Sequence, residues 1–168
     1  MRRLLCSLTL LLATTLAQAQ LDAPIQGGIP AGSGAGVHSP QSPFPPLKER
    51  GDVLSWSQLT SVKTRVEKNR VLPVFPADIL ALDGKPQRVQ GFMMPLEPGE
   101  KQTHFLLSSV PLSCSFCLPG GPESMIEVKS KTPIRYGMEP VVVQGRLSVL
   151  HDDPYGLYYR ITDAVPVK

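Results

Sequence analysis

Residues 87–96 read QRVQGFMMPL, and this stretch decides the fold. It is a ten-residue run of extended character, and it follows the turn signal Asp83-Gly84. From this point the side chains follow a period of two, which is typical of strands. Similar runs, each bounded by proline, glycine or aspartate, occur at His104–Ser108, Met125–Lys129, Val141–Leu150 and Leu157–Ala164. The sequence therefore predicts a mainly β chain with five strands.

Two of these strands, the first and the fourth, carry a glycine near the middle, at Gly91 and Gly145. A glycine inside a strand marks a bulge or a sharp bend, which is how a small sheet curls and closes. Five short strands of this kind predict a small OB-like barrel, with a β-sandwich as the alternative. The segment 130–140 contains Pro133 and Gly137, so we do not expect the helix that usually lies between the third and fourth OB strands.

A short helix is expected before the barrel. Trp56, Leu59, Val62 and Val66 recur at intervals of three and four residues, and Ser55 is a suitable N-cap. The sequence thus predicts a helix over residues 55–66 whose apolar face packs on the sheet. A turn or second short helix is expected around residues 78–82.

The N-terminal part resembles an export signal followed by a linker. Residues 1–19 combine a basic head with an apolar run too short to span a bilayer, and small residues precede a cleavage point after Ala19. An uncleaved membrane anchor is the competing interpretation. Residues 20–50 are rich in proline and glycine and predict a disordered tether, acting either as a spacer towards a membrane-bound partner or as a plain tail. Residues 51–168 are then a single β-rich domain in the periplasm.

The charge balance narrows the class of partner. After loss of the signal, fifteen basic residues face fourteen acidic ones, so the net charge is +1. A nearly neutral surface has no strong long-range field. Nucleic acid and an anionic membrane are therefore not expected as main partners, and we expect contact with the membrane only through another protein.

Two cysteines, Cys114 and Cys117, remain after processing and form a CxxC motif in a loop bracketed by prolines. Such a pair can bind a soft metal, cycle between dithiol and disulfide, or form a permanent local disulfide. A thioredoxin-type site needs a helix that starts at the first cysteine. Leu-Pro-Gly-Gly-Pro follows Cys117 and prevents such a helix, which disfavours the redox interpretation.

The metal interpretation needs further ligands. A tetrahedral zinc site takes four, usually cysteine or histidine, and the chain has one CxxC. His104, His151 or a second molecule would have to supply the others, and His104 is our first candidate. Cu(I), the less favoured ion, accepts two thiolates with a thioether, for which the candidates are Met93, Met94 and Met125. Each of these residues also has a plain structural explanation, as a strand, turn or core side chain.

No catalytic motif is present. The sequence lacks GxSxG, HExxH and a glycine-rich phosphate loop. Tyrosines near residues 155–159 could line a ligand-binding barrel face, although alternation places about half of them in the core. The sequence therefore favours a non-enzymatic role, with thiol–disulfide exchange as the enzymatic alternative.

The order of several short runs resembles the DUF3299 family of exported bacterial proteins. These runs are LDGK at 82–85, VQGFMMPL at 89–96, HFLL at 104–107, CSFC at 114–117, VVVQGRL at 141–147 and GLYYRI at 156–161, and the resemblance covers about residues 74–165. It implies a periplasmic or lipid-anchored OB-like domain that accompanies ABC exporters of the MacB/FtsX type or metal-responsive systems. It also implies that Cys114 and Cys117 are the functional pair.

Together these features predict a periplasmic accessory or binding protein with a CxxC loop that binds a transition metal, zinc above all, beside a membrane transporter or another envelope protein. A thiol–disulfide exchange protein is the first alternative. A structural interaction module with a permanent local disulfide is the second.

Overall fold

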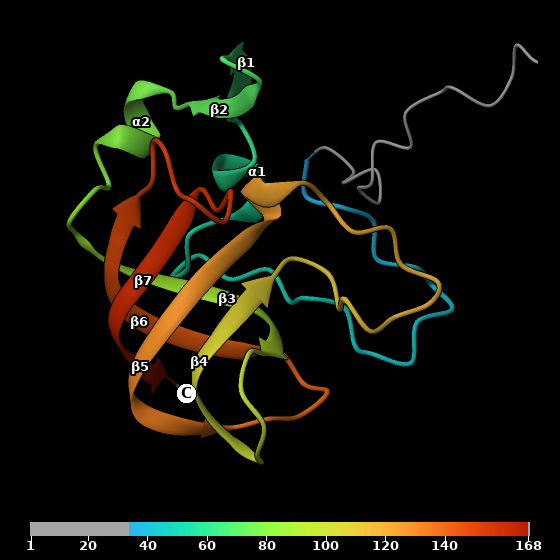
Figure 1. Cartoon of the computed structure of the whole chain (residues 1–168). Helices are drawn as coiled ribbons and strands as arrows, with labels where there is room; N and C mark the ends of the chain where they lie inside the picture. Colours follow the sequence, from blue (N-terminus) through green and yellow to red (C-terminus); the bar gives the residue numbers. More distant parts are fainter. Residues whose placement is uncertain (1–33, 168) are drawn as a thin grey trace, which may run out of the picture.

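A closed five-stranded barrel forms the body of the protein (Figure 1). The computed structural model describes residues 34–167. The barrel strands are β3 (Pro86–Pro95), β4 (Lys101–Ser108), β5 (Met125–Arg135), β6 (Val141–Val149) and β7 (Tyr159–Val167), in the order β3-β4-β5-β7-β6. Neighbouring strands are antiparallel except β5 and β7, which are parallel. The predicted mainly β, OB-like barrel is therefore confirmed, and no helix separates β5 from β6.

The two mid-strand glycines lie where a barrel strand changes its partner or its register. β3 pairs with β6 up to Gly91 and with β4 from Phe92 onward, so the strand changes partner at this residue. A Cβ atom at Gly91 would lie 2.9 Å from the Ser108 carbonyl oxygen. At Gly145 the β6–β7 register shifts, and a Cβ atom would lie 2.6 Å from Ile161 Cγ2. Only glycine permits these close approaches, and the predicted bends follow from them.

Alternation along the strands fills the barrel interior with apolar side chains, among them the fully buried Phe105, Ile126 and Ile161. Two short helices, α1 (Trp56–Leu59) and α2 (Ala77–Leu80), add Leu59 and Ile79 to this core. The Tyr159 hydroxyl donates a hydrogen bond of 2.7 Å to the Leu59 carbonyl oxygen, which fixes α1 to β7.

The predicted helix over residues 55–66 is wrong beyond its first turn. Ser55 does cap α1, and its hydroxyl accepts a hydrogen bond from the Gln58 amide. The chain then forms the hairpin of β1 (Lys63–Glu67) and β2 (Arg70–Val74). Its turn residues, Lys68 and Asn69, both have positive φ, as a two-residue hairpin turn requires. This turn, and the β-branched residues around it, outweigh the helical spacing of the valines.

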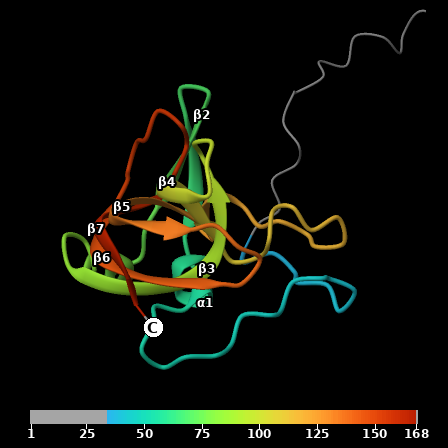
Figure 2. The same cartoon turned by 90° about the horizontal axis from the view of Figure 1, so that it is seen from below.

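The expected signal peptide (1–19) and the first part of the expected tether lie outside the described residues. The remainder of that tether, residues 34–50, runs along the loop between β4 and the 3-10 helix η1 (Pro122–Ser124), and both protrude on the same side of the barrel (Figures 1 and 2). Proline- and glycine-rich composition did not indicate these contacts. Within residues 34–167 the structure contains no helix with the length and apolar character required to cross a membrane.

Candidate functional site

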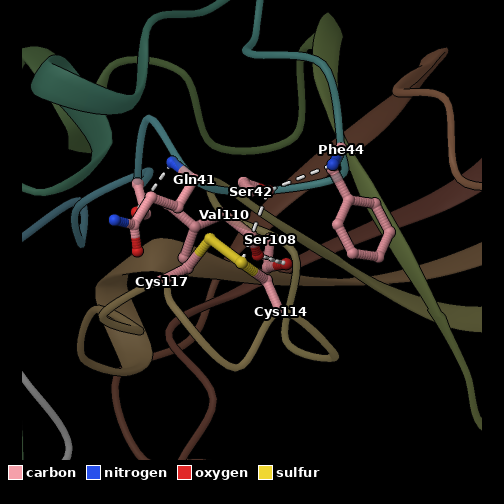
Figure 3. The surroundings of a disulfide bond; sticks show 8 residues. Gln41, Ser42, Phe44, Ser108, Val110, Cys114 and Cys117 are labelled. Carbon is pink, nitrogen blue, oxygen red and sulfur yellow. Dashed lines mark hydrogen bonds between the residues drawn. A yellow bond between two sulfur atoms is a disulfide. The ribbon is translucent and has the colours of Figure 1, made fainter.

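The CxxC motif closes on itself. Cys114 and Cys117 form a disulfide with their Cα atoms 5.4 Å apart (Figure 3). Two consecutive turns bring the sulfur atoms together: the Cys114 amide donates to the Pro111 carbonyl, and the Cys117 amide donates to the Cys114 carbonyl, both at 3.2 Å. Each cysteine is only 7% exposed. Neither sulfur is a free thiolate in this state, and neither is freely accessible to solvent.

A second segment, residues 34–44, lies across the disulfide loop, and we call it the strap. Val37 and Leu118 exchange two backbone hydrogen bonds of 2.8 and 3.0 Å. Ser109 Oγ donates to the Ala35 carbonyl, and the Gly34 amide donates to Glu123 Oε1 at 2.7 Å. The strap therefore attaches at three points to a loop more than seventy residues later in the chain.

The fit between the strap and the loop depends on glycine. Gly36 has a φ of 72°, and a Cβ atom there would lie 2.5 Å from the Leu118 carbonyl oxygen. A Cβ atom at Gly120 would lie 2.1 Å from the Gly34 carbonyl oxygen. Backbone meets backbone at both positions, so no side chain can move aside to admit a larger residue.

The disulfide belongs to a small apolar cluster that is separate from the barrel core. Val110 and the two cysteines are buried together, and Phe44 of the strap packs against them. Ser42 Oγ lies 3.3 Å from Cys114 Sγ (Figure 3). The strap thus contributes one aromatic ring to the cluster and one hydroxyl group next to a sulfur atom.

The structure does not bring His104 to the cysteines. His104 Nε2 lies 2.8 Å from Glu127 Oε1, on the outer face of the barrel. It precedes Ser108, the end of β4, by four residues, or ~13 Å along a strand. Between residues 34 and 167 no group of three or more histidine, cysteine, aspartate or glutamate side chains is arranged to hold a metal ion.

The other suggested ligands have different neighbours. His151 stacks edge-on against Phe75, with ring centroids 5.4 Å apart. Met93 is buried in the barrel core, and Met125 begins β5. Met93 and Met94 both line a groove of about 180 Å³ that also contains Ser113, the residue before Cys114. Met138 lies in the same groove.

Sequence reasoning missed a charged network on the outer face of β4, β5 and β7. Glu127 accepts hydrogen bonds from His104 and from Arg160, and Arg160 also donates to Asp153 at 3.1 Å. Burial alone would raise the pKa of the Glu127 carboxyl, but the hydrogen bonds from His104 and Arg160 outweigh it and hold the pKa below its ordinary value. The only signal in the sequence is a lone acid between Ile126 and Val128.

Three large apolar side chains of the loop and the strap are exposed. Val37 is 59% exposed, Phe116 59% and Leu118 65%. We call these three side chains the loop surface. They stand on two segments whose backbones are tied to each other and, in the loop, to the disulfide.

Comparison with known proteins identifies the family of the chain. The model of the family described as a protein of unknown function (DUF3299) matches residues 52–156. A crystal structure of a DUF3299 family protein from Pseudomonas aeruginosa PAO1 is similar at 22% identity, with a TM-score of 0.42, over 57% of this chain and 68% of that one. Among curated proteins none matches this chain. Since the family model spans well over half of the sequence, the chain belongs to the DUF3299 family.

Proposed function

We propose that this protein is an exported accessory domain that binds a protein partner in the cell envelope through the loop surface. The observation that carries the proposal is the exposure of Val37, Phe116 and Leu118 on a loop that a buried disulfide and a backbone-paired strap hold in place. The partner we propose is the envelope domain of a transporter, because the family resemblance associates such domains with ABC exporters.

The energetics favour binding over a structural role for these side chains. Burying one large apolar side chain contributes about 1.5–3 kcal/mol, and here three are left in solvent. A rigid loop loses little conformational entropy when a partner covers it. The strap and the disulfide supply this rigidity before the partner arrives.

Thiol–disulfide exchange is less well supported. An incoming thiolate must reach a disulfide sulfur, yet both cysteines are 7% exposed and belong to a cluster against which Phe44 packs. No α-helix begins at Cys114, so no helix dipole would stabilise its thiolate. The pair therefore serves best as a local brace of the loop.

Metal binding by the reduced pair is the second candidate. Reduction would leave two thiolates side by side, and zinc would need two further ligands from a partner or a second copy. The groove with Met94 and Met138 borders the residue before Cys114, which favours a thioether ligand for Cu(I). Titration of the reduced protein with Zn(II) and Cu(I) tests this candidate. A Cys114→Ser/Cys117→Ser variant that retains wild-type affinity would rule it out.

The partner proposal can be tested in cells that export the full chain. A photo-crosslinking amino acid is placed at Phe116 or at Leu118, and at Tyr155 as a control, since Tyr155 is 86% exposed but lies in the loop before β7. We expect both loop positions to crosslink to the same envelope protein, identified by mass spectrometry, and Tyr155 not to do so. Equal crosslinking from all three sites, or none, would contradict the proposal.

A quantitative control follows with the purified partner domain. Phe116→Ser combined with Leu118→Ser should weaken binding by at least tenfold while the unfolding midpoint changes little, because both side chains are exposed. The same change at Tyr155 should leave the affinity unaltered. Localisation is tested separately, by fractionation and by the N-terminal sequence of the mature protein, which we expect to begin at Gln20.

A further inference from the structure

The β1–β2 hairpin stands away from the barrel and is exposed at every residue of β1 (Figures 1 and 2). It pairs with no other strand of the described chain. Val66 is 77% exposed and Val71 60%, and these two residues are paired across the strands, on one face. Two strands alone are only marginally stable in water, so a ribbon with this surface is a candidate for pairing with something outside the chain.

The pairing register of β1 and β2 shows which backbone N–H and C=O groups have no partner within the hairpin. Glu67 pairs with Arg70 across the two-residue turn, and in such a hairpin this pair exchanges both hydrogen bonds. Hydrogen-bonded pairs of this kind recur at every second residue. The residues between them on β1, Thr64 and Val66, therefore direct their N–H and C=O groups away from β2. Within residues 34–167 neither residue has another backbone partner.

The two outer edges of the ribbon differ. On β2 the residues that point outward are Val71 and Pro73, and proline has no N–H to donate. The β2 edge is therefore blunted. The β1 edge keeps both donors and both acceptors of Thr64 and Val66, in the spacing that an added strand requires.

Charge indicates the chemistry of the added strand. Between residues 63 and 70 there are four basic side chains and one acid, Glu67. Arg65 pairs with Glu67 at 3.3 Å and Arg70 with Asp152, which leaves Lys63 and Lys68 without a carboxylate partner in the described chain. The face of Lys63, Arg65 and Arg70 therefore carries a net positive charge, and the other face carries the exposed valine pair.

We propose that the free edge of β1 accepts an extended segment of a partner protein by strand addition, and that this segment alternates acidic and apolar residues. Acidic side chains would lie on the face of Lys63 and Arg65, and apolar ones on the face of Val66 and Val71. Main-chain hydrogen bonds to Thr64 and Val66 provide the pairing, and the alternation selects the register. This surface is independent of the loop surface, and either can fail without the other.

The test uses an eight-residue peptide of alternating glutamate and valine as the probe, with a lysine–valine peptide of the same length as its control. Binding to the exported domain is followed by NMR, together with amide hydrogen exchange. We expect the acidic peptide to bind and to slow exchange at Thr64 and Val66 at least tenfold, and the basic peptide to do neither. Equal binding of both peptides, or no slowing at these two amides, would overturn the proposal and leave the lysines as guards against edge pairing.

Two proline variants distinguish the edges. Val66→Pro removes an outward N–H from β1, whereas Val71→Pro removes the matching N–H from β2, and neither breaks a bond inside the hairpin. We expect Val66→Pro to weaken peptide binding at least tenfold and Val71→Pro to change it less than twofold. The reverse order would overturn the assignment to β1. Should either variant disorder the hairpin, the exchange measurement on the unaltered protein still decides.

Discussion

Replacement of Glu127 by glutamine should destabilise the barrel by about 2 kcal/mol, because one charge-assisted hydrogen bond is lost from a buried site. The Glu127 side chain is 9% exposed and accepts hydrogen bonds from His104 and Arg160. Glutamine retains one acceptor oxygen and turns an NH₂ group towards the other donor. Arg160 keeps its bond to Asp153, which keeps the loss below that of a fully broken buried ion pair.

Urea unfolding followed by circular dichroism measures this change. For a domain of this size, 2 kcal/mol corresponds to a fall in Tm of roughly 8 °C. The matched control is Asp163→Asn, which removes the surface ion pair between Asp163 and Lys131. The Lys131 side chain is 64% exposed and that of Asp163 is 56% exposed. That pair should contribute less than about 0.5 kcal/mol. Asparagine also tolerates the positive φ of Asp163.

The pH dependence gives a second measure of the same interaction. The pKa of Glu127 is lowered in the folded state, so the unfolded chain binds the proton more readily, and the stabilisation is present above the ordinary carboxyl pKa. It is lost as the pH falls from that value through the folded-state pKa. The stability difference between the wild type and Glu127→Gln should therefore shrink below about pH 4.5. A difference under 0.5 kcal/mol at neutral pH, or one that is independent of pH, would refute the reasoning.

Two further predictions concern packing. Gly36→Ala should detach the strap, because its Cβ would lie 2.5 Å from the Leu118 carbonyl oxygen, whereas Gly34→Ala meets nothing within 4 Å at a similar positive φ. Amide exchange at Leu118 should rise at least tenfold in the first variant and much less in the second, and equal effects would show that φ alone matters. Tyr159→Phe removes a buried hydrogen bond to Leu59 and should cost about 1–2 kcal/mol in urea unfolding. Burial raises the pKa of Tyr159, so the wild type should also lose stability as the pH rises above about 10, and Tyr159→Phe should lose less.

The barrel was predictable because the pattern that defines each strand lies within a short stretch of sequence. Each of the five expected strands overlaps an observed one, since alternation and bounding turns are encoded within ten residues. Gly91 and Gly145 marked the bends because a close backbone approach excludes any Cβ. The β1–β2 hairpin was missed because the local sequence pattern was misleading there. Val62 and Val66 match a helical spacing by coincidence, and the turn at Lys68-Asn69 carries no glycine to signal it.

The candidate site was predictable only in part. The spacing of Cys114 and Cys117 indicated that two sulfur atoms could meet, and they do. What the pair can do depends on its surroundings, and those come from a segment seventy residues earlier that has no periodic pattern. Val37 and Leu118 pair through their backbones, and the Gly34 amide donates to the Glu123 carboxylate, so each contact uses a backbone group that composition does not encode.

The same reasoning decides between a brace and a metal centre. A metal site needs its third and fourth ligands in place before the ion binds with high affinity, and here the neighbours of the sulfur atoms are Phe44, Val110 and Ser42. These side chains favour a closed disulfide in an apolar setting, since a buried thiolate without a positive charge nearby is costly. For the metal proposal to hold, the strap must move away from the loop on reduction. Addition of zinc to the reduced protein should then change the amide protection of Val37 and Leu118, whereas for a brace zinc changes nothing.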